Sequence, residues 1–253
     1  MKTNQLQLKK YLISQYETKF SGWDFSYLDG KMEESPLPWN YRTIITEYMK
    51  TSSCMLDMGT GGGEFLDSLE ELPKLVYATE GYAPNIPIAQ NRLKHKNIEV
   101  KVIDETNVLP FDNASFDLVI NRHEEYIVDE VKRVLKENGY FVTQQVGGMN
   151  DIDINSTLGA NPPHYYNWCL LKTIEDLTNA GYKIVISDEM IGYSRFYDIG
   201  SIVYYLKCIP WQIDDFSVEK YFDRLCLLDE YIKEHKYKDF IHHRFYVIAQ
   251  KIS

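Results

Sequence analysis

Short apolar runs alternate along much of the chain with segments whose apolar residues lie three or four positions apart. The first pattern is typical of strands and the second of amphipathic helices. Strands are predicted at residues 54–56, 75–79, 98–104, 117–120, 140–146, 183–191 and 244–250. Helices are predicted at residues 6–16, 44–49, 64–72, 128–138 and 174–180, and within 198–241. This alternation of strand and helix predicts an open α/β sheet.

Two stretches stand outside the alternation. Residues 1–50 combine a helix with a turn-rich segment around two prolines, which favours an ordered loop. Residues 198–241 form a helical insert that is too long for a hairpin connection. We expect a single domain over residues 1–253, in which both stretches act as lids and residues 51–150 hold the core site.

Residues 57–63 have the sequence D-M-G-T-G-G-G and separate the first predicted strand from a helix. A glycine turn in this place forms a nucleotide site at the carboxyl end of the strand. The dinucleotide fingerprint G-x-G-x-x-G/A fails, because its third small residue would fall on Glu64 or Leu66. The acid beside the loop, Asp57, would also repel a pyrophosphate. The spacing acid-x-G-x-G-x-G therefore favours a cofactor with a positively charged amino acid portion.

This spacing resembles the first motif of the class I S-adenosylmethionine (SAM) dependent methyltransferases. The resemblance implies that Gly59, Thr60, Gly61 and Gly63 let the backbone approach SAM closely, and that Asp57 helps to place its amino acid end. The alternative for an isolated glycine run is a flexible turn without a ligand.

Acids follow the next two predicted strands. Glu80 lies about 20 residues beyond the glycines, the offset at which a carboxylate accepts from ribose hydroxyls. Its alternative role is a solvated acid at a strand end. The resemblance implies that Asp104, which precedes the segment L-P-F-D-N-A-S-F-D of residues 109–117, accepts a hydrogen bond from the adenine amino group. The predicted cofactor contacts are completed by Gly81, Glu105 and Asn121.

The candidate catalytic residues follow the fourth predicted strand, where the resemblance places the methyl acceptor. Methyl transfer needs the acceptor held in line with the leaving sulfur, and a base only if the acceptor arrives protonated. His123 is the general-base candidate because the pKa of histidine lies near neutrality. Glu124 either orients the imidazole or accepts the proton itself. The alternatives are that these charges only begin a helix, and that His123 only contacts the cofactor.

Polar and aromatic residues outside the glycine loop supply the candidate acceptor contacts, which are Trp39, Arg122, Gln145, His164, Tyr165 and Arg195. Arg122 and Arg195 suit an acidic acceptor. Two prolines fix the loop that presents His164 and Tyr165. With 14% aromatic residues, the chain has the means to shape a pocket for a small organic ligand. The alternative is that these aromatic residues only pack a lid.

Net charge and cysteine usage limit the classes of ligand and partner that we expect for the chain. A net charge of −10 disfavours RNA or DNA, because nucleic-acid binders usually present a basic face. The four cysteines contain no C-x-x-C pair and indicate free thiols, and His242–His243 has no third ligand nearby, so no metal is predicted. The absence of a long apolar segment and of a signal-peptide core leads us to expect a cytoplasmic protein. Nothing in the sequence indicates the oligomeric state.

Together these features predict a SAM-dependent methyltransferase that acts on a small organic acceptor and yields S-adenosylhomocysteine. The expected fold is a Rossmann-like, doubly wound and mostly parallel seven-stranded sheet, with an antiparallel last strand implied by the resemblance. That resemblance covers roughly residues 50–150. The alternatives are an rRNA or tRNA methyltransferase and a non-catalytic protein that binds SAM or S-adenosylhomocysteine.

Overall fold

The computed structural model describes residues 2–252, and the chain divides into two compact units. Unit 1 contains Met1–Pro36, Gly147–Trp168 and Met190–His243. Unit 2 contains Leu37–Val146, Cys169–Glu189 and Arg244–Ser253. The helical insert and the part of the N-terminal stretch up to Pro36 therefore fall within the same unit, whereas residues 37–50 belong to unit 2.

Unit 2 is built as alternating strands and helices. Its elements are α2 (Tyr41–Met49), β2 (Cys54–Met58), α3 (Glu64–Asp67), β3 (Leu75–Glu80), α4 (Ile86–Leu93), η2 (Lys94–Lys96), β4 (Glu99–Val102), β5 (Phe116–Arg122), α5 (Val128–Val134), β6 (Leu135–Val146) and α7 (Leu170–Asn179). Two further strands, β7 (Tyr182–Phe196) and β8 (Lys238–Lys251), contribute residues to both units.

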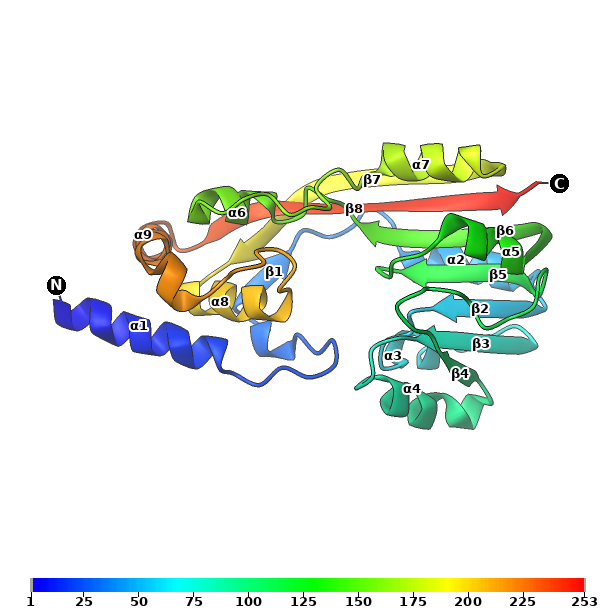
Figure 1. Ribbon diagram of the computed structural model, residues 1–253, viewed down its shortest axis with the longest axis horizontal. Coiled ribbons are helices and arrows are strands. Elements are labelled where there is room, and N and C mark those ends of the chain that lie inside the picture. Colours follow the sequence, from blue (N-terminus) through cyan, green and yellow to red (C-terminus); the bar gives the residue numbers. More distant parts are fainter. Residues whose placement is uncertain (1, 253) are drawn as a thin grey trace. The chain divides into compact units, whose positions relative to one another are not determined.

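The sheet is mixed, and among the described residues its order is β1-β7-β8-β6-β5-β2-β3-β4. β2 pairs in parallel with β3 and β5, β3 with β4, and β5 with β6. β8 pairs antiparallel with β6, which confirms the expected antiparallel last strand. The arrows of the parallel strands point the same way in Figure 1, so their carboxyl ends meet at one edge of unit 2.

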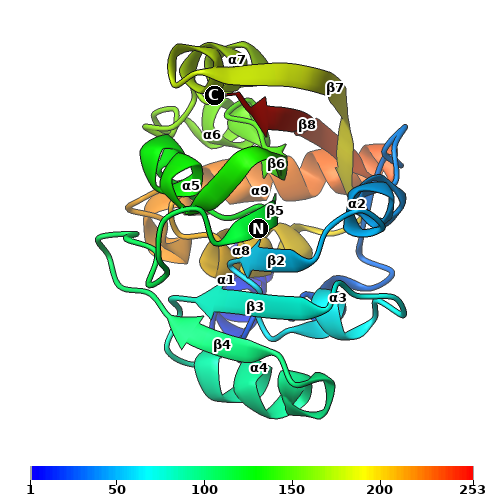
Figure 2. The same cartoon turned by 90° about the vertical axis from the view of Figure 1, so that its right-hand side faces the viewer.

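The strands of unit 2 bury both faces. Met55, Leu118 and Ile120 belong to the cluster that packs with α2, whereas their neighbours Leu56 and Val119 are also fully buried. Successive side chains of a strand point to opposite faces, so this continuous burial requires cover on both sides. Figures 1 and 2 show α2 and α3 on one face of these strands and α5 on the other, as a doubly wound fold requires.

The strand count differs from the prediction of seven, because the described residues form eight strands. The additional strand is β1 (Met32–Glu34), which pairs antiparallel with β7 in the segment predicted as an ordered loop. With two glutamates in its three residues, β1 has no apolar alternation to reveal it. Backbone pairing with a distant partner makes it a strand.

The bounds of several elements also differ from the prediction. α3 ends at Asp67 instead of residue 72, because Arg42 donates to the carbonyl and hydroxyl of Ser68 and satisfies the end of the helix. α5 ends at Val134, and Leu135 already pairs with Phe116 in the sheet. β7 extends five residues beyond its predicted end at residue 191.

Unit 1 is mainly helical. Its elements are α1 (Lys2–Tyr16), η1 (Ser26–Leu28), β1, α6 (Ile152–Leu158), α8 (Ile199–Cys208), α9 (Val218–His235) and parts of β7 and β8. In α8 every residue except Lys207 is buried, which makes it the central helix of the unit's apolar cluster. The aromatic residues of this unit mostly pack against one another, as Phe196, Tyr204 and Tyr205 show.

Candidate functional site

The glycine loop follows β2 with three glycines in the left-handed region. Gly59, Gly61 and Gly63 have φ angles of 65°, 63° and 83°. Residues with a side chain rarely adopt this conformation. The loop is pinned to β3, because the backbone N–H of Thr60 donates to the carbonyl of Thr79 at 2.9 Å and that of Gly59 to its hydroxyl at 3.3 Å. The loop is thus an ordered turn with little side-chain bulk.

Two buried carboxylates flank the loop. Asp57 is the last residue but one of β2, Glu80 is the last residue of β3, and each is only 5% exposed. Burial raises the pKa of Asp57 to about 6. Burial also raises the pKa of Glu80, although backbone N–H groups, led by that of Tyr82 at 2.7 Å and including that of Gly61, favour its charged form. The structure therefore brings both predicted acids to the glycine loop.

Asp104 and Glu105 follow β4 and are exposed. The carboxylate of Asp104 accepts from the backbone N–H of Thr106 at 2.9 Å and from its hydroxyl, which lowers its pKa. Gly81, directly after Glu80, lies against this segment, because a Cβ at Gly81 would come within 3.4 Å of Ile103. The predicted adenine and ribose contacts thus follow neighbouring parallel strands.

Asn121 is the centre of a buried polar group at the end of β5. Its side-chain oxygen accepts from the hydroxyl of Thr143 at 2.9 Å and from the amide of Gln145 at 2.7 Å. Its side-chain nitrogen is buried and has no hydrogen-bond partner within residues 2–252. Asn121 pairs with Met58 across β2 and β5, next to the glycine loop. A buried donor without a partner suggests a ligand atom that accepts its hydrogen bond.

Glu124 lies over the glycine loop. A Cβ added at Gly59 would be 2.4 Å from the Glu124 Cγ, so the absence of a side chain there makes room for Glu124. Burial raises the pKa of Glu124 to about 7, and the negative charges of Glu80 and Glu125 contribute. Asp57, Glu80 and Glu124 therefore form a group of acids whose charged forms are disfavoured in the free protein.

His123 is exposed and has a φ of 66°, in the left-handed region. Its Nε2 lies 3.0 Å from the side-chain nitrogen of Gln144, whose oxygen accepts from the indole N–H of Trp39 at 2.8 Å. The sequence placed Trp39 and His123 among the candidates but gave Gln144 no role. Its position one residue before Gln145 in the same strand was the only available signal.

Arg122 is exposed and lies over the ring of Phe65, with 4.3 Å between the guanidinium carbon and the ring centroid. Its positive charge also favours the charged form of Asp57. Arg122 is therefore placed beside the acids of the loop, where it can act on an anionic group.

The three remaining substrate candidates lie in unit 1. Arg195, on β7, forms a two-pronged ion pair with Asp239 at 2.7 and 2.9 Å and contacts Glu33 at 3.5 Å. An anionic acceptor would have to compete with these carboxylates for it. His164 is exposed, and Tyr165 donates from its hydroxyl to Gln212 at 2.8 Å.

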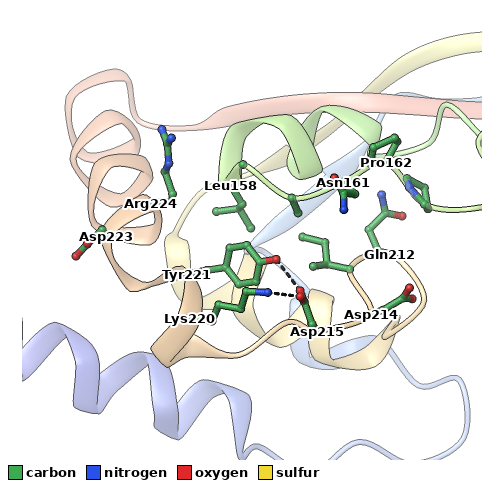
Figure 3. A pocket seen from close by; sticks show the side chains of 14 residues that line it. Leu158, Asn161, Pro162, Gln212, Asp214, Asp215, Lys220, Tyr221, Asp223 and Arg224 are labelled. Carbon is green, nitrogen blue, oxygen red and sulfur yellow. Dashed lines mark hydrogen bonds and ion pairs between the residues drawn. The ribbon is translucent and has the colours of Figure 1, made fainter.

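Unit 1 also contains a cavity of about 540 Å³ (Figure 3). Asn161, Pro162 and Pro163 line it, and they belong to the loop predicted to face an acceptor. Figure 3 shows the side chains of Lys220 and Tyr221 pointing to Asp215, to which both bind. The volume suits a small organic molecule.

Within residues 2–252 no group of three or more His, Cys, Asp or Glu side chains is placed to hold a metal ion. His242 and His243 are buried in β8. None of the helices in the described part of the chain is long and apolar enough to cross a membrane.

The residues around the glycine loop fit SAM. The loop leaves space beside the backbone, Asp57 and Glu80 are buried acids that suit a cation and ribose hydroxyls, and Asn121 has an unsatisfied buried donor. SAM carries a sulfonium and an ammonium group. A pyrophosphate would meet the repulsion of these acids.

The family comparison agrees with this geometry. Residues 56–143 match the family described as a methyltransferase domain, and this range begins in β2 and ends in β6. No curated protein matches the sequence.

Solved structures share the fold at low sequence identity. A proposed methyltransferase from Bacillus halodurans C-125 is 16% identical, with 84% of this chain and 99% of that chain covered and a TM-score of 0.59. Geranyl diphosphate methyltransferase in complex with SAM is 12% identical, with 83% and 84% covered and a TM-score of 0.51. The [4+2]-cyclase SpnF is 16% identical, with 83% and 79% covered and a TM-score of 0.53.

The sheet order, the glycine loop and the matched domain define an α/β protein of the Rossmann-like methyltransferase fold. The methyltransferase domain matched by residues 56–143 and the shared fold confirm the resemblance to the class I SAM-dependent methyltransferases that was found in the sequence.

Proposed function

We propose that the protein transfers a methyl group from SAM to a small organic acceptor. The observation that carries the proposal is the pair of buried acids, Asp57 and Glu80, on either side of a glycine loop that lacks side-chain bulk. The proposed cofactor contacts are Asp57, Gly59, Thr60, Gly61, Gly63, Glu80, Gly81, Asp104, Glu105 and Asn121.

Each of the acids has a distinct task in this proposal. Glu80 accepts from the ribose hydroxyls, for which its two oxygens are suited. Asp104 accepts from the adenine amino group. Asp57 would help to place the amino acid end, because its negative charge suits the ammonium group.

When bound, SAM would supply a methyl group on a positively charged sulfur that leaves as a neutral thioether. An acceptor that arrives protonated must give its proton to a base of the chain. Glu124 has a pKa of about 7, which lies near the working pH of a general base. Glu124 and His123 are the proposed catalytic residues.

The acceptor is proposed to be a small molecule. The net charge of −10 supports this class over nucleic acid. Trp39, Arg122, Gln145, His164, Tyr165 and Arg195 remain the proposed acceptor contacts. The free thiols of all four cysteines are consistent with a cytoplasmic location, which is part of the proposal.

A protein that binds SAM without transferring its methyl group is the competing function. SpnF, a cyclase with this fold, is the observation that favours considering it, because a fold does not fix the reaction.

The first experiment is thermal unfolding with S-adenosylhomocysteine and with NAD as separate ligands. A ligand at about 100 times its dissociation constant should stabilise the protein by roughly 2.7 kcal/mol. We expect stabilisation by S-adenosylhomocysteine alone. Stabilisation by NAD, or by neither ligand, would contradict the cofactor assignment.

The second experiment incubates the protein with SAM labelled in its methyl group and a pool of small metabolites, with transfer RNA as a separate acceptor. Label recovered in small molecules supports the proposal. Label recovered in RNA favours the nucleic-acid alternative. Tight SAM binding without transfer to either pool favours the non-catalytic alternative.

A further inference from the structure

Two residues of unit 2 approach each other at the exit of β5. The backbone N–H of His123 donates to the carbonyl of Gln144 at 2.8 Å, and the His123 Nε2 lies 3.0 Å from the Gln144 Nε2. The imidazole and the amide therefore share one hydrogen bond between two nitrogen atoms. Such a bond needs one donor and one acceptor, and its direction decides what the imidazole can do.

The contact with Trp39 determines which of the two nitrogen atoms donates in this hydrogen bond. Its indole Nε1 lies 2.8 Å from the Gln144 Oε1, and an indole nitrogen only donates. The oxygen of the amide must therefore face Trp39, which leaves the NH₂ group facing His123. Gln144 is only 4% exposed, and the Trp39 ring packs against Tyr246 with 5.0 Å between ring centroids. A flip of the amide would place the NH₂ group against the indole N–H.

An NH₂ group only donates, so the His123 Nε2 must accept and cannot carry a proton. In the neutral ring the proton is then on Nδ1. We propose that Gln144 is a positioning residue that, held by Trp39, fixes His123 as its Nδ1–H tautomer, so that His123 serves as a hydrogen-bond donor and Glu124 as the base. This inference rests on the proposed methyl transfer.

The geometry disfavours His123 as a base at both of its nitrogens. Nδ1 already carries the proton. Protonation of Nε2 would set its N–H against the NH₂ group of Gln144, which would lose the hydrogen bond and leave two donors facing each other. Glu124 has no such obstacle, because its carboxylate can accept the proton lost by an acceptor. Its pKa of about 7 is consistent with that task.

The test that does not depend on catalysis is nitrogen NMR of the histidine rings in the full chain. The sequence has six histidines, so His123→Gln identifies the His123 signals by their disappearance. At a pH where the ring is neutral, we expect an unprotonated Nε2 and a protonated Nδ1. A protonated Nε2 in the neutral ring would overturn the inference.

Gln144→Glu reverses the direction of the hydrogen bond with His123. A carboxylate accepts both from the Trp39 indole and from the imidazole, so it draws a proton to the His123 Nε2. We expect the Nε2 signal to change to the protonated type in this variant. Gln250→Glu adds the same charge on β8, where Gln250 donates to the carbonyl of Asn138, and should leave the His123 signals unchanged. Trp39→Phe removes the N–H that orients the amide, and we expect a mixture of tautomers. A single Nδ1–H tautomer in Trp39→Phe would remove Trp39 from the mechanism.

Once an acceptor is known, turnover separates positioning from a merely structural role. At a pH where NMR shows the His123 ring to be neutral, Gln144→Glu moves the proton from Nδ1 to Nε2. It should then lower kcat by about 100-fold, the lower range for loss of an oriented donor, with little change in SAM affinity, while Gln250→Glu keeps kcat. Unchanged kcat together with the altered NMR signals would overturn the positioning role. If no methyl transfer is found at all, the proposed function fails while the tautomer result stands on its own.

Discussion

At the scale of single residues, Glu80 has the most sharply defined expected task. It is buried at the end of β3 and its pKa is raised by burial, yet no basic side chain is among the groups that set this pKa. Such a carboxylate is costly in the free protein and gains most from a ligand that donates hydrogen bonds to it.

We therefore predict that Glu80→Gln weakens SAM binding by about 1–3 kcal/mol, because ribose hydroxyls lose one charged acceptor. Isothermal titration calorimetry measures the change. Glu99→Gln, at an exposed position of β4, is the matched control and should bind SAM like the unchanged protein. Equal affinity in the two variants would remove Glu80 from the site.

The placement of polar residues, as distinct from their roles, was predictable from the sequence where they border the glycine loop or lie at the end of a strand. Asp57, Glu80 and Glu124 are examples, since the structure brings all three to one loop. Gln144 was not predictable. Neighbouring residues of a strand point to opposite faces, and the sequence gives no sign of whether residue 144 or 145 faces the imidazole.

At the scale of elements, the glycine loop depends on two separate properties of Gly59. Its φ of 65° favours glycine, and Glu124 fills the space that a side chain would need. Gly30 has a φ of 72° but no atom within 4 Å of an added Cβ. A substitution at Gly30 therefore tests the cost of the left-handed backbone alone, whereas one at Gly59 adds the cost of the contact with Glu124.

We predict that Gly30→Ala lowers the free energy of unfolding by about 1–2 kcal/mol, the cost of the left-handed conformation alone. Gly59→Ala should lower it further and abolish stabilisation by S-adenosylhomocysteine, because Glu124 must move. Urea denaturation with and without the ligand measures both effects. A stability loss in Gly59→Ala no larger than in Gly30→Ala would show that the contact with Glu124 costs nothing.

The order of most strands and helices in unit 2 followed from the hydrophobic pattern, but several features of the fold did not. β1 and the first residues of β6 are strands only because a distant segment pairs with them. α3 ends early because Arg42 of α2 reaches its last turn. Local patterns carry no information about such partners, which is why element ends and short strands are the parts that differ.

At the scale of the whole molecule, the acids of the loop affect stability. The pKa of Asp57 rises from 3.8 to about 6 on folding and that of Glu124 from 4.5 to about 7. A carboxyl with a raised pKa binds its proton more tightly in the folded state. Its destabilising effect is therefore absent below the unfolded pKa, grows between the two pKa values and is complete above the folded one.

We predict that these groups make the ligand-free protein less stable as the pH rises from about 4 to 7, by about 3 kcal/mol for the fully buried Asp57 at the end of that range. Glu124→Gln should be more stable than the unchanged protein at pH 8, with a smaller difference at pH 4.5. Urea denaturation at both pH values measures this, with Glu99→Gln as the control. If Glu124→Gln were less stable than the unchanged protein at pH 8, the predicted destabilising effect of the charged Glu124 would be contradicted.

The same acids predict how cofactor affinity depends on pH. A cation binds best to charged carboxylates, so the affinity for SAM should rise as the pH increases from about 5 to 7 and level off above. Calorimetry in buffers of different ionisation enthalpy should detect protons released on binding. S-adenosylhomocysteine lacks the sulfonium charge and should show a weaker dependence. If the affinities for both ligands depended equally on pH, the charge of the sulfonium would have no effect on binding to these acids.

β7 and β8 supply residues to both units, and neither unit is a continuous stretch of chain. During synthesis, residues 37–146 leave the ribosome with β6 as an open edge, because its antiparallel partner on β8 begins at Arg244. Neither unit can therefore complete its strand pairing before this late segment has been synthesised. The interval between residue 146 and residue 251 is when the nascent chain is most exposed to edge-to-edge aggregation, and a chaperone that covers β6 would be most useful then.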